Sequence, residues 1–110
     1  MEVKKLSTRV LALLHRVPKG RVTTYKALAR AVGNENLARM IGRILSQNKE
    51  VDKYPCYKVV RSDGRIGGYS LGVREKIRRL KREGIGVKNN RIIDFERMVF
   101  EFDEKLKRKN

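Results

Sequence analysis

The segment from residue 37 to residue 47 has the strongest helical periodicity in the sequence. Its apolar residues recur at i, i+3, i+4, i+7 and i+8, at Leu37, Met40, Ile41, Ile44 and Leu45. This spacing puts them on one side of an α-helix, which must be buried. The other side is small or basic, with Ala38, Arg39, Gly42, Arg43 and Ser46. Glycine within a helix costs about 1 kcal/mol relative to alanine, and close approach of another backbone would explain Gly42.

Two further helices are expected before this segment. The first spans about three turns and ends at Pro18-Lys19-Gly20, with apolar residues at Leu6, Val10, Leu13, Leu14 and Val17. After a short strand at Arg21-Val22-Thr23, either Thr23 or Thr24 is a suitable N-cap for a second helix. That helix carries Tyr25, Leu28, Ala29 and Val32 on one side. Together with the 37–47 helix it has the outline of a helix-turn-helix; the alternative is a helical pair whose exposed side happens to be cationic.

The second half of the chain predicts short strands and one more helix. Ser62-Asp63-Gly64 is a hairpin turn signal between Lys58–Arg61 and Arg65-Ile66. Val73, Ile77 and Leu80 predict a helix ending near Glu83-Gly84, and we place six basic residues on its exposed face, Arg74, Lys76, Arg78, Arg79, Lys81 and Arg82. The stretch 91–102 suits a strand or a helix. We expect a mainly α, winged helix-turn-helix-like domain with short β-strands over residues 1–103, and a disordered basic tail over residues 104–110.

The charge balance predicts a polyanionic partner. The 110 residues include 28 Lys and Arg against 12 Asp and Glu, a formal net charge of +16. Nucleic acid is the commonest such partner, because each neutralised phosphate releases counterions. A highly charged, heat-adapted surface would explain many charges, but not a surplus of one sign. The sequence has no signal peptide or apolar run of membrane-spanning length, so we expect a cytoplasmic, DNA-associated protein and no membrane contact.

Cysteine and histidine usage narrows the chemistry. With one cysteine and one histidine, the chain cannot form an internal disulfide, and we expect no metal site. Cys56 follows Pro55, which fixes its own φ and biases Tyr54 to an extended shape, so the thiol sits on a rigid turn. Free cysteines are usually inert core residues. Lys58 and the general positive field instead favour the nucleophilic thiolate.

Six groups of residues, in order and spacing, resemble one protein family. They are Arg21-Val22-Thr23-Thr24-Tyr25, Val32-Gly33-Asn34 with Ala38-Arg39-Met40-Ile41-Gly42, Asn48, Pro55-Cys56-Tyr57-Lys58-Val59-Val60, Gly67-Gly68-Tyr69-Ser70 and Glu83-Gly84. The sequence resembles the DNA-binding and active-site domain of the methylated-DNA-protein-cysteine methyltransferases, which repair O6-alkylguanine. The resemblance covers roughly residues 4–96.

For DNA binding, the resemblance implies that the helix from Leu37 to Gln47 enters the minor groove. Small residues at Ala38 and Gly42 would let it come close. Arg39 matches the arginine that fills the gap left by the flipped guanine, which lowers the cost of flipping. Thr24 and Arg43 complete the expected DNA contacts.

For the chemistry, the resemblance implies direct displacement of the alkyl group onto Cys56, leaving a permanent thioether and needing no cofactor. Asn48 matches a residue that braces the nucleophile's turn, and Glu83 the carboxylate at the far end of the relay that deprotonates the thiol. Tyr25 would promote flipping and assist departure of the guanine. The expected substrate contacts are Tyr25, Tyr69, Ser70 and Val59.

The relay departs from the family pattern. This chain has Pro-Cys-Tyr-Lys-Val where alkyl-transferring members usually have Pro-Cys-His-Arg-Val, so Tyr57 replaces the histidine of the relay. A phenol with a pKa of about 10 is a poor general base at neutral pH, and we expect a slower nucleophile. Lys58 keeps the cation in place of arginine. We expect His15 to be a surface or packing residue rather than a substitute base.

Three functions follow from these residues. The first is irreversible transfer of an alkyl group from O6-alkylguanine in duplex DNA to Cys56. The second is that of a non-catalytic alkyltransferase-like protein, which recognises the lesion and flags it for excision repair; such proteins lack the cysteine that this chain retains. The third is a general DNA-binding module. We expect a monomer, with alkylated duplex DNA and excision-repair or other repair proteins as partners.

Overall fold

The computed structural model of the protein describes residues 3–102, so the tail expected at residues 104–110 lies outside the described part of the chain. The elements follow the order α1 (Val3–Leu14), β1 (Thr23–Thr24), α2 (Tyr25–Ala31), α3 (Ala38–Ser46), β2 (Val59–Val60), α4 (Val73–Arg82), β3 (Val87–Lys88), β4 (Arg91–Ile92) and α5 (Phe95–Met98). Single 3-10 turns precede α3 and β2, at Glu35–Leu37 and Cys56–Lys58. The expected mainly α fold with short strands is confirmed. None of the helices in residues 3–102 has the length and hydropathy needed to cross a membrane.

The first helix ends earlier than the apolar spacing predicts. α1 stops at Leu14, and residues 15–17 continue in tight turns, in which the Val17 N–H donates to the Leu14 carbonyl at 3.2 Å. Pro18 explains the early end, because a proline disfavours helical geometry in the residue before it. Val17 is nevertheless buried with Leu6, Val10 and Leu14.

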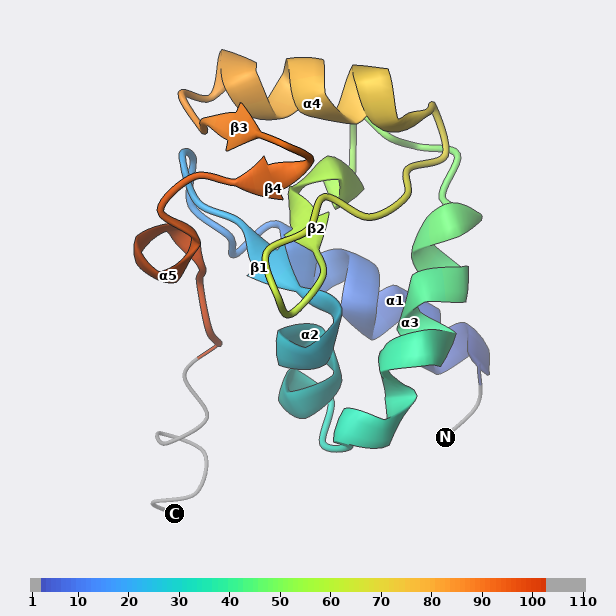
Figure 1. Cartoon of the computed structure of the whole chain (residues 1–110). Coiled ribbons are helices and arrows are strands. Elements are labelled where there is room, and N and C mark those ends of the chain that lie inside the picture. The colour runs from blue at the N-terminus through green and yellow to red at the C-terminus, as the bar shows by residue number, and fades with distance from the viewer. Residues whose placement is uncertain (1–2, 103–110) are drawn as a thin grey trace.

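The α2–α3 pair has the expected helix-turn-helix outline (Figure 1). The Thr24 hydroxyl caps α2 by accepting a hydrogen bond from the Ala27 N–H at 2.9 Å. Threonine is one of the residues preferred at the N-cap position of a helix. α3 buries Ile41, Ile44 and Leu45. Its opposite side leaves Arg39 and Arg43 exposed, as the periodicity predicts.

The predicted hairpin around residues 58–66 does not form as a strand pair. Its turn is present, with the Gly64 N–H donating to the Arg61 carbonyl at 2.9 Å. However, β2, which precedes this turn, pairs in parallel with β1, in the register Thr23↔Val59 and Thr24↔Val60. Both valines of β2 are fully buried, which suits a parallel pair inside the core better than a two-stranded surface hairpin.

The C-terminal part forms a hairpin that the sequence analysis did not identify. β3 and β4 pair antiparallel through a two-residue turn at Asn89 and Asn90, whose φ angles are 52° and 63°. Such left-handed angles at both turn residues are typical of tight hairpins, and asparagine tolerates them. The stretch 91–102 therefore contains both a strand and a helix, β4 and α5, before Val99 bridges back to Val22.

The helix α4 differs from its predicted faces. Lys76, expected on the exposed face, is fully buried, while Val73, expected inside, is 40% exposed. α4 lies along the upper edge of the molecule next to β3 (Figure 1). Its inner side, with Lys76 and Leu80, thereby reaches the turn that carries Cys56.

Candidate active site

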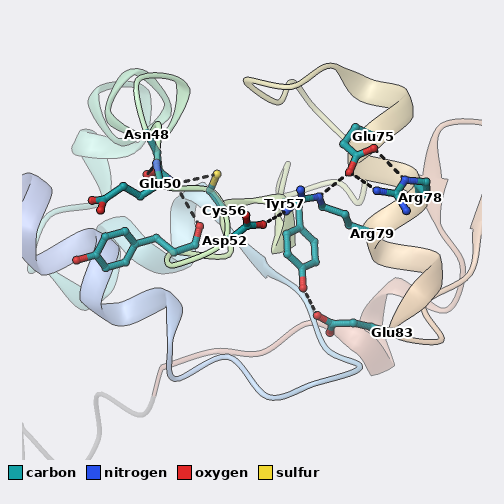
Figure 2. A network of polar contacts seen from close by, with 10 residues as sticks. Asn48, Glu50, Asp52, Cys56, Tyr57, Glu75, Arg78, Arg79 and Glu83 are labelled. Atoms are coloured by element: carbon teal, nitrogen blue, oxygen red, sulfur yellow. Dashed lines mark hydrogen bonds and ion pairs between the residues drawn. The ribbon is translucent and has the colours of Figure 1, made fainter.

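Cys56 begins the 3-10 turn that leads into β2, directly after Pro55. Its side chain is 5% exposed. The Asn48 side-chain amide donates to the Tyr54 carbonyl at 3.1 Å and to the Cys56 sulfur at 3.4 Å (Figure 2). Its oxygen accepts from the Glu50 N–H at 3.0 Å. Asn48 thus connects the segment after α3 to the turn that carries Cys56. In residues 3–102 it supplies the one hydrogen bond to the sulfur.

The sulfur faces a cavity of about 250 Å³. Three of the four expected substrate contacts line it with Cys56, and the full lining is Tyr25, Gly42, Leu45, Ser46, Cys56, Gly68, Tyr69 and Ser70. The Tyr69 hydroxyl is buried and has no hydrogen-bond partner within the described residues. Val59, the fourth expected contact, does not line the cavity, because its side chain is fully buried in the core on β2.

A larger groove of about 490 Å³ adjoins this cavity. It runs between α3 and the 61–68 loop and is lined by Tyr25, Lys26, Glu35, Ala38, Arg39, Gly42, Arg61, Ser62, Asp63, Gly67 and Gly68. Tyr25, Gly42 and Gly68 belong to both hollows, so a ligand in the groove reaches the cavity past these residues. Arg61 was not identified from the sequence, because its turn carries no periodic signal.

Three of the five expected DNA contacts line the groove, and two, Thr24 and Arg43, do not. Ala38, Arg39 and Gly42 line the groove, whereas Arg43 is exposed on α3 outside it. Thr24 is 4% exposed, and its hydroxyl is occupied by the α2 cap. The hydroxyl is thus taken by the cap, and the expected contact of Thr24 with DNA stays a prediction.

Tyr57 contacts Glu83 and makes no direct hydrogen bond to the Cys56 sulfur in residues 3–102. Its hydroxyl donates to a Glu83 carboxylate oxygen (Figure 2), and its side chain lines a separate cavity with His15 and Arg79. Burial raises the pKa of Tyr57, and the Glu83 carboxylate raises it further. The phenol therefore keeps its proton at neutral pH. The expected contact between residue 57 and Glu83 is thus present, whereas no direct hydrogen bond joins Tyr57 to the Cys56 sulfur in residues 3–102, and the relay itself stays a prediction.

Glu83 is held by three donors. One oxygen accepts from the Gly20 N–H at 2.9 Å and lies 3.1 Å from Lys58 Nζ, and the other accepts from Tyr57. Burial alone would raise the pKa of Glu83, but the hydrogen bonds from Tyr57, Gly20 and Lys58 outweigh it and lower the pKa. Glu83 is thus an ionised anchor between the end of α4 and the turn after α1.

Lys58 is not the cation beside the thiol. Its buried ammonium group donates to the Val17 carbonyl at 3.1 Å and the Pro18 carbonyl at 2.7 Å, and it pairs with Glu83. Lys58 ends the 3-10 turn that Cys56 begins, and it does not line the cavity. The expectation that Lys58 activates Cys56 is therefore replaced by a structural role, in which Lys58 binds Glu83 to the chain segment before Pro18.

The buried cation near Cys56 is Lys76, which the sequence analysis placed on the surface. Its Nζ donates to the carbonyls of Val59, Ile66 and Gly68 at 2.7, 2.6 and 2.9 Å. Burial lowers the pKa of Lys76 to about 8, and the nearby Cys56 opposes that shift. One signal was available: Lys76 lies at i−4 from Leu80, within the apolar stripe of α4.

His15 behaves as a packing residue at the surface. Its ring lies 5.3 Å from that of Tyr54, centroid to centroid, in a tilted arrangement. It lines the same separate cavity as Tyr57, on the other side of the nucleophile's turn. In residues 3–102, no group of three or more His, Cys, Asp or Glu side chains is placed to hold a metal ion.

Fold and site together define a small helix-turn-helix domain that keeps one cysteine at a cavity beside a basic helix. Residues 5–85 match the family described as the DNA-binding domain of 6-O-methylguanine DNA methyltransferase, and the chain belongs to this family.

Three similar proteins illustrate the range of the family. A bifunctional methyltransferase/endonuclease of Picrophilus torridus is 48% identical over 100 residues, which is 91% of this chain but 33% of that protein. This chain therefore spans about a third of that relative's length. A DNA base-flipping protein of Vibrio parahaemolyticus is 33% identical over 79 residues, 72% of this chain and 79% of the relative. The solved structure of S. pombe Atl1 with damaged DNA containing O6-carboxymethylguanine matches with a TM-score of 0.73 and 27% identity, over 80% of this chain and 83% of Atl1.

Proposed function

We propose that this protein repairs DNA by transferring an alkyl group from O6-alkylguanine in duplex DNA irreversibly to Cys56. One observation carries the proposal: the single cysteine of the chain lines a cavity of about 250 Å³ between Tyr25 and Tyr69, and its sulfur is oriented by Asn48. Aromatic walls suit a flat purine turned out of the base stack. The similarity to methyltransferases supports the same activity.

DNA binding is assigned to α3 and its groove. The exposed Arg39 and the small Ala38 and Gly42 line the groove from one helix. Small residues let the helix approach the minor groove, and Arg39 would occupy the space that the flipped guanine leaves. The cavity shares Tyr25 and Gly42 with the groove, which gives the flipped base a short path to the sulfur.

The chemical step is a displacement at the alkyl carbon. The Cys56 thiol releases its proton to solvent, the sulfur forms a bond to the alkyl carbon, and the bond from that carbon to guanine O6 breaks. The electron pair leaves with the guanine, which takes a proton from water. Burial raises the pKa of Tyr25, so its hydroxyl stays protonated and can donate a hydrogen bond to the departing base. No cofactor enters this balance.

Intact-protein mass spectrometry tests the transfer. Incubation with a duplex containing O6-methylguanine should add the mass of one methyl group to the peptide that holds Cys56, with at most one addition per molecule. Cys56→Ser is the control and should gain nothing. An unmodified thiol in a sample that binds the duplex tightly would contradict the proposal.

Lesion recognition without transfer is the second candidate. It is favoured by the orientation of Tyr57, which provides no base for the thiol, and by the similarity to Atl1 and to a base-flipping protein. In this case Cys56→Ala would keep a higher affinity for modified than for plain duplex, and wild type would gain no methyl mass. Excision-repair or other repair proteins would then be the partners of a monomer acting on DNA in the cytoplasm.

Equal affinity for both duplexes would instead indicate a general DNA-binding module.

A further inference from the structure

Arg61 lines the groove from the loop that lies across from α3. It follows β2 directly, its N–H donates to the Arg65 carbonyl at 2.9 Å, and its carbonyl accepts from the Gly64 N–H at 2.9 Å. Because β2 is fully buried, this closed turn starts from a strand that the core holds in place. The side chain of Arg61 is exposed and lines the same groove as Arg39 of α3. The groove thus has an arginine on each side.

Arg61 also lies at the entrance to the cavity of Cys56. A Cβ added at Gly67 would lie 3.4 Å from Arg61 Cγ and 3.4 Å from the Tyr25 hydroxyl oxygen, so the arginine stem and the hydroxyl meet at this glycine. Tyr25 lines both the groove and the cavity. Burial raises the pKa of Tyr25, and the positive charge of Arg61 opposes that rise. A ligand that passes from the groove into the cavity therefore passes Arg61.

The guanidinium group of Arg61 is available to a ligand. It makes no hydrogen bond or ion pair within the described part of the chain. The two carboxylates that line the groove are paired with other cations, Asp63 with Arg65 at 3.4 Å and Glu35 with Arg30 at 2.6 Å. A guanidinium group is always charged in proteins, and its fork of N–H donors matches a phosphate through two parallel hydrogen bonds.

A flipped nucleotide would place a phosphate at this entrance. The nucleotide turns about its own backbone, so its base leaves the duplex while its two flanking phosphates stay in the strand. In the proposed function, the base enters the cavity past Tyr25 and Gly68, which line both hollows. The flanking phosphates then remain on the groove side of the entrance, where Arg61 lies.

We propose that Arg61 binds one of the two backbone phosphates that flank the flipped nucleotide and so holds the lesion strand at the cavity entrance. This inference rests on the proposed function and adds a DNA contact outside α3. The two groove arginines then divide the work, because Arg39 fills the gap in the base stack and Arg61 fixes the strand that has left it.

Neutralising single phosphates tests the contact. Binding is measured by fluorescence anisotropy in a Cys56→Ser background, which has no thiol to accept the methyl group. The O6-methylguanine duplexes carry a neutral methylphosphonate at one flanking position at a time. Either this replacement or Arg61→Gln should weaken binding about tenfold, the low end for a hydrogen bond to a charged group. The two changes together should weaken binding little further, because they remove the same pair. Fully additive losses at both flanking phosphates would overturn the proposal.

Arg65→Gln is the matched control on the same turn. Arg65 is exposed and pairs with Asp63, but it does not line the groove. Its loss should therefore be additive with each methylphosphonate. Arg61→Lys keeps the charge but not the fork of donors, so its affinity should lie between those of wild type and Arg61→Gln. If Arg65 couples to a flanking phosphate as strongly as Arg61 does, the general charge of the turn explains the binding and the assignment to Arg61 is wrong.

The two proposals fail in different ways. Coupling of Arg61 to a flanking phosphate, with no methyl group gained by wild-type Cys56, would contradict the transfer and leave the phosphate contact in place. Methyl transfer by wild type, with additive losses in the phosphate series, would contradict the role of Arg61 alone.

Discussion

The hydroxyl of Tyr57 donates to the carboxylate of Glu83, in a cavity that the Cys56 sulfur does not line. The residue directly after Cys56 therefore secures the end of α4. Glu83 meets Lys58 and the Gly20 N–H at the same point. Tyr57, Lys58 and Glu83 thus form one anchoring cluster outside the cavity of Cys56.

Tyr57→Phe should leave the reactivity of Cys56 unchanged and lower the free energy of unfolding by about 1.5–3 kcal/mol, the usual net value of a hydrogen bond to a charged group. Iodoacetamide kinetics and urea denaturation measure the two effects. Tyr69→Phe is a matched control for stability, because the Tyr69 hydroxyl has no partner in residues 3–102 and its removal should cost nothing. A strong loss of thiol reactivity in Tyr57→Phe would instead show that Tyr57 takes part in a relay between Cys56 and Glu83.

Glu83→Gln should lower the free energy of unfolding by about 3–5 kcal/mol, because it leaves the buried Lys58 ammonium without its counter-charge. Urea denaturation at neutral pH measures the loss. Glu35→Gln is the comparison, since Glu35 pairs with Lys26 and Arg30 at the exposed surface, where ion pairs contribute little to stability, and it should cost much less. Equal effects of the two substitutions would mean that the Glu83 cluster is not a buried anchor.

Stability should also fall in acid through Glu83. The pKa of Glu83 is lowered in the folded protein. The folded protein therefore binds the carboxyl proton of Glu83 less tightly than the unfolded chain does. The contribution is fully present above the unfolded pKa of about 4.3 and is lost as the pH falls through the folded value. Thermal unfolding from pH 6 to pH 2 should show a steeper loss in wild type than in Glu83→Gln. Parallel curves would exclude Glu83 as a source of this pH dependence.

Arg39→Ala should reduce the preference for O6-methylguanine duplex over plain duplex more than it reduces overall affinity, because Arg39 lines the groove beside the cavity. Arg43→Ala is the matched control on the same helix. It should weaken binding to both duplexes equally and reduce the slope of log affinity against log salt by about 0.9, as for one phosphate contact. Fluorescence anisotropy over a salt series measures both. Equal weakening by the two variants would make Arg39 a phosphate contact only.

Gly42→Ala should separate stability from DNA binding. A Cβ at this position would meet Tyr25 at 4.0 Å, an ordinary contact, so the helix should gain up to about 1 kcal/mol. The added methyl group projects where groove and cavity meet, so DNA affinity should fall. Thermal unfolding and anisotropy measure the two effects. Unchanged affinity would show that α3 does not approach DNA closely at Gly42.

Local patterns were sufficient for the positions of α2, α3 and α4 and for the turn of Cys56. The spacing from Leu37 to Leu45 predicts both faces of α3, and Thr24 was identified as one of two N-cap candidates because capping depends on residues three apart. The Asn89-Asn90 turn is also a local signal, because asparagine tolerates the left-handed angles of a tight hairpin turn. The groove-lining Ala38, Arg39 and Gly42 followed from the same helical spacing.

Contacts between distant segments were not predictable in this way. Whether β2 pairs with residues 65–66 or with β1 depends on which arrangement buries Val59 and Val60, and that is decided by the rest of the core. The direction of Tyr57 follows from the position of Glu83, 26 residues later in the chain. A pairing of this kind leaves no periodic trace in the sequence.

The sequence by itself determined the helical segments, the basic surface, the stiff turn at the lone cysteine and the family resemblance, because these depend on residue types and on spacings of a few residues. Only the tertiary structure decided which cation lies near the thiol. Lys58 and Lys76 are chemically alike, and both are buried. They differ in which carbonyls and carboxylate the folded chain gathers around each ammonium group, and that set is assembled by segments far apart in the sequence.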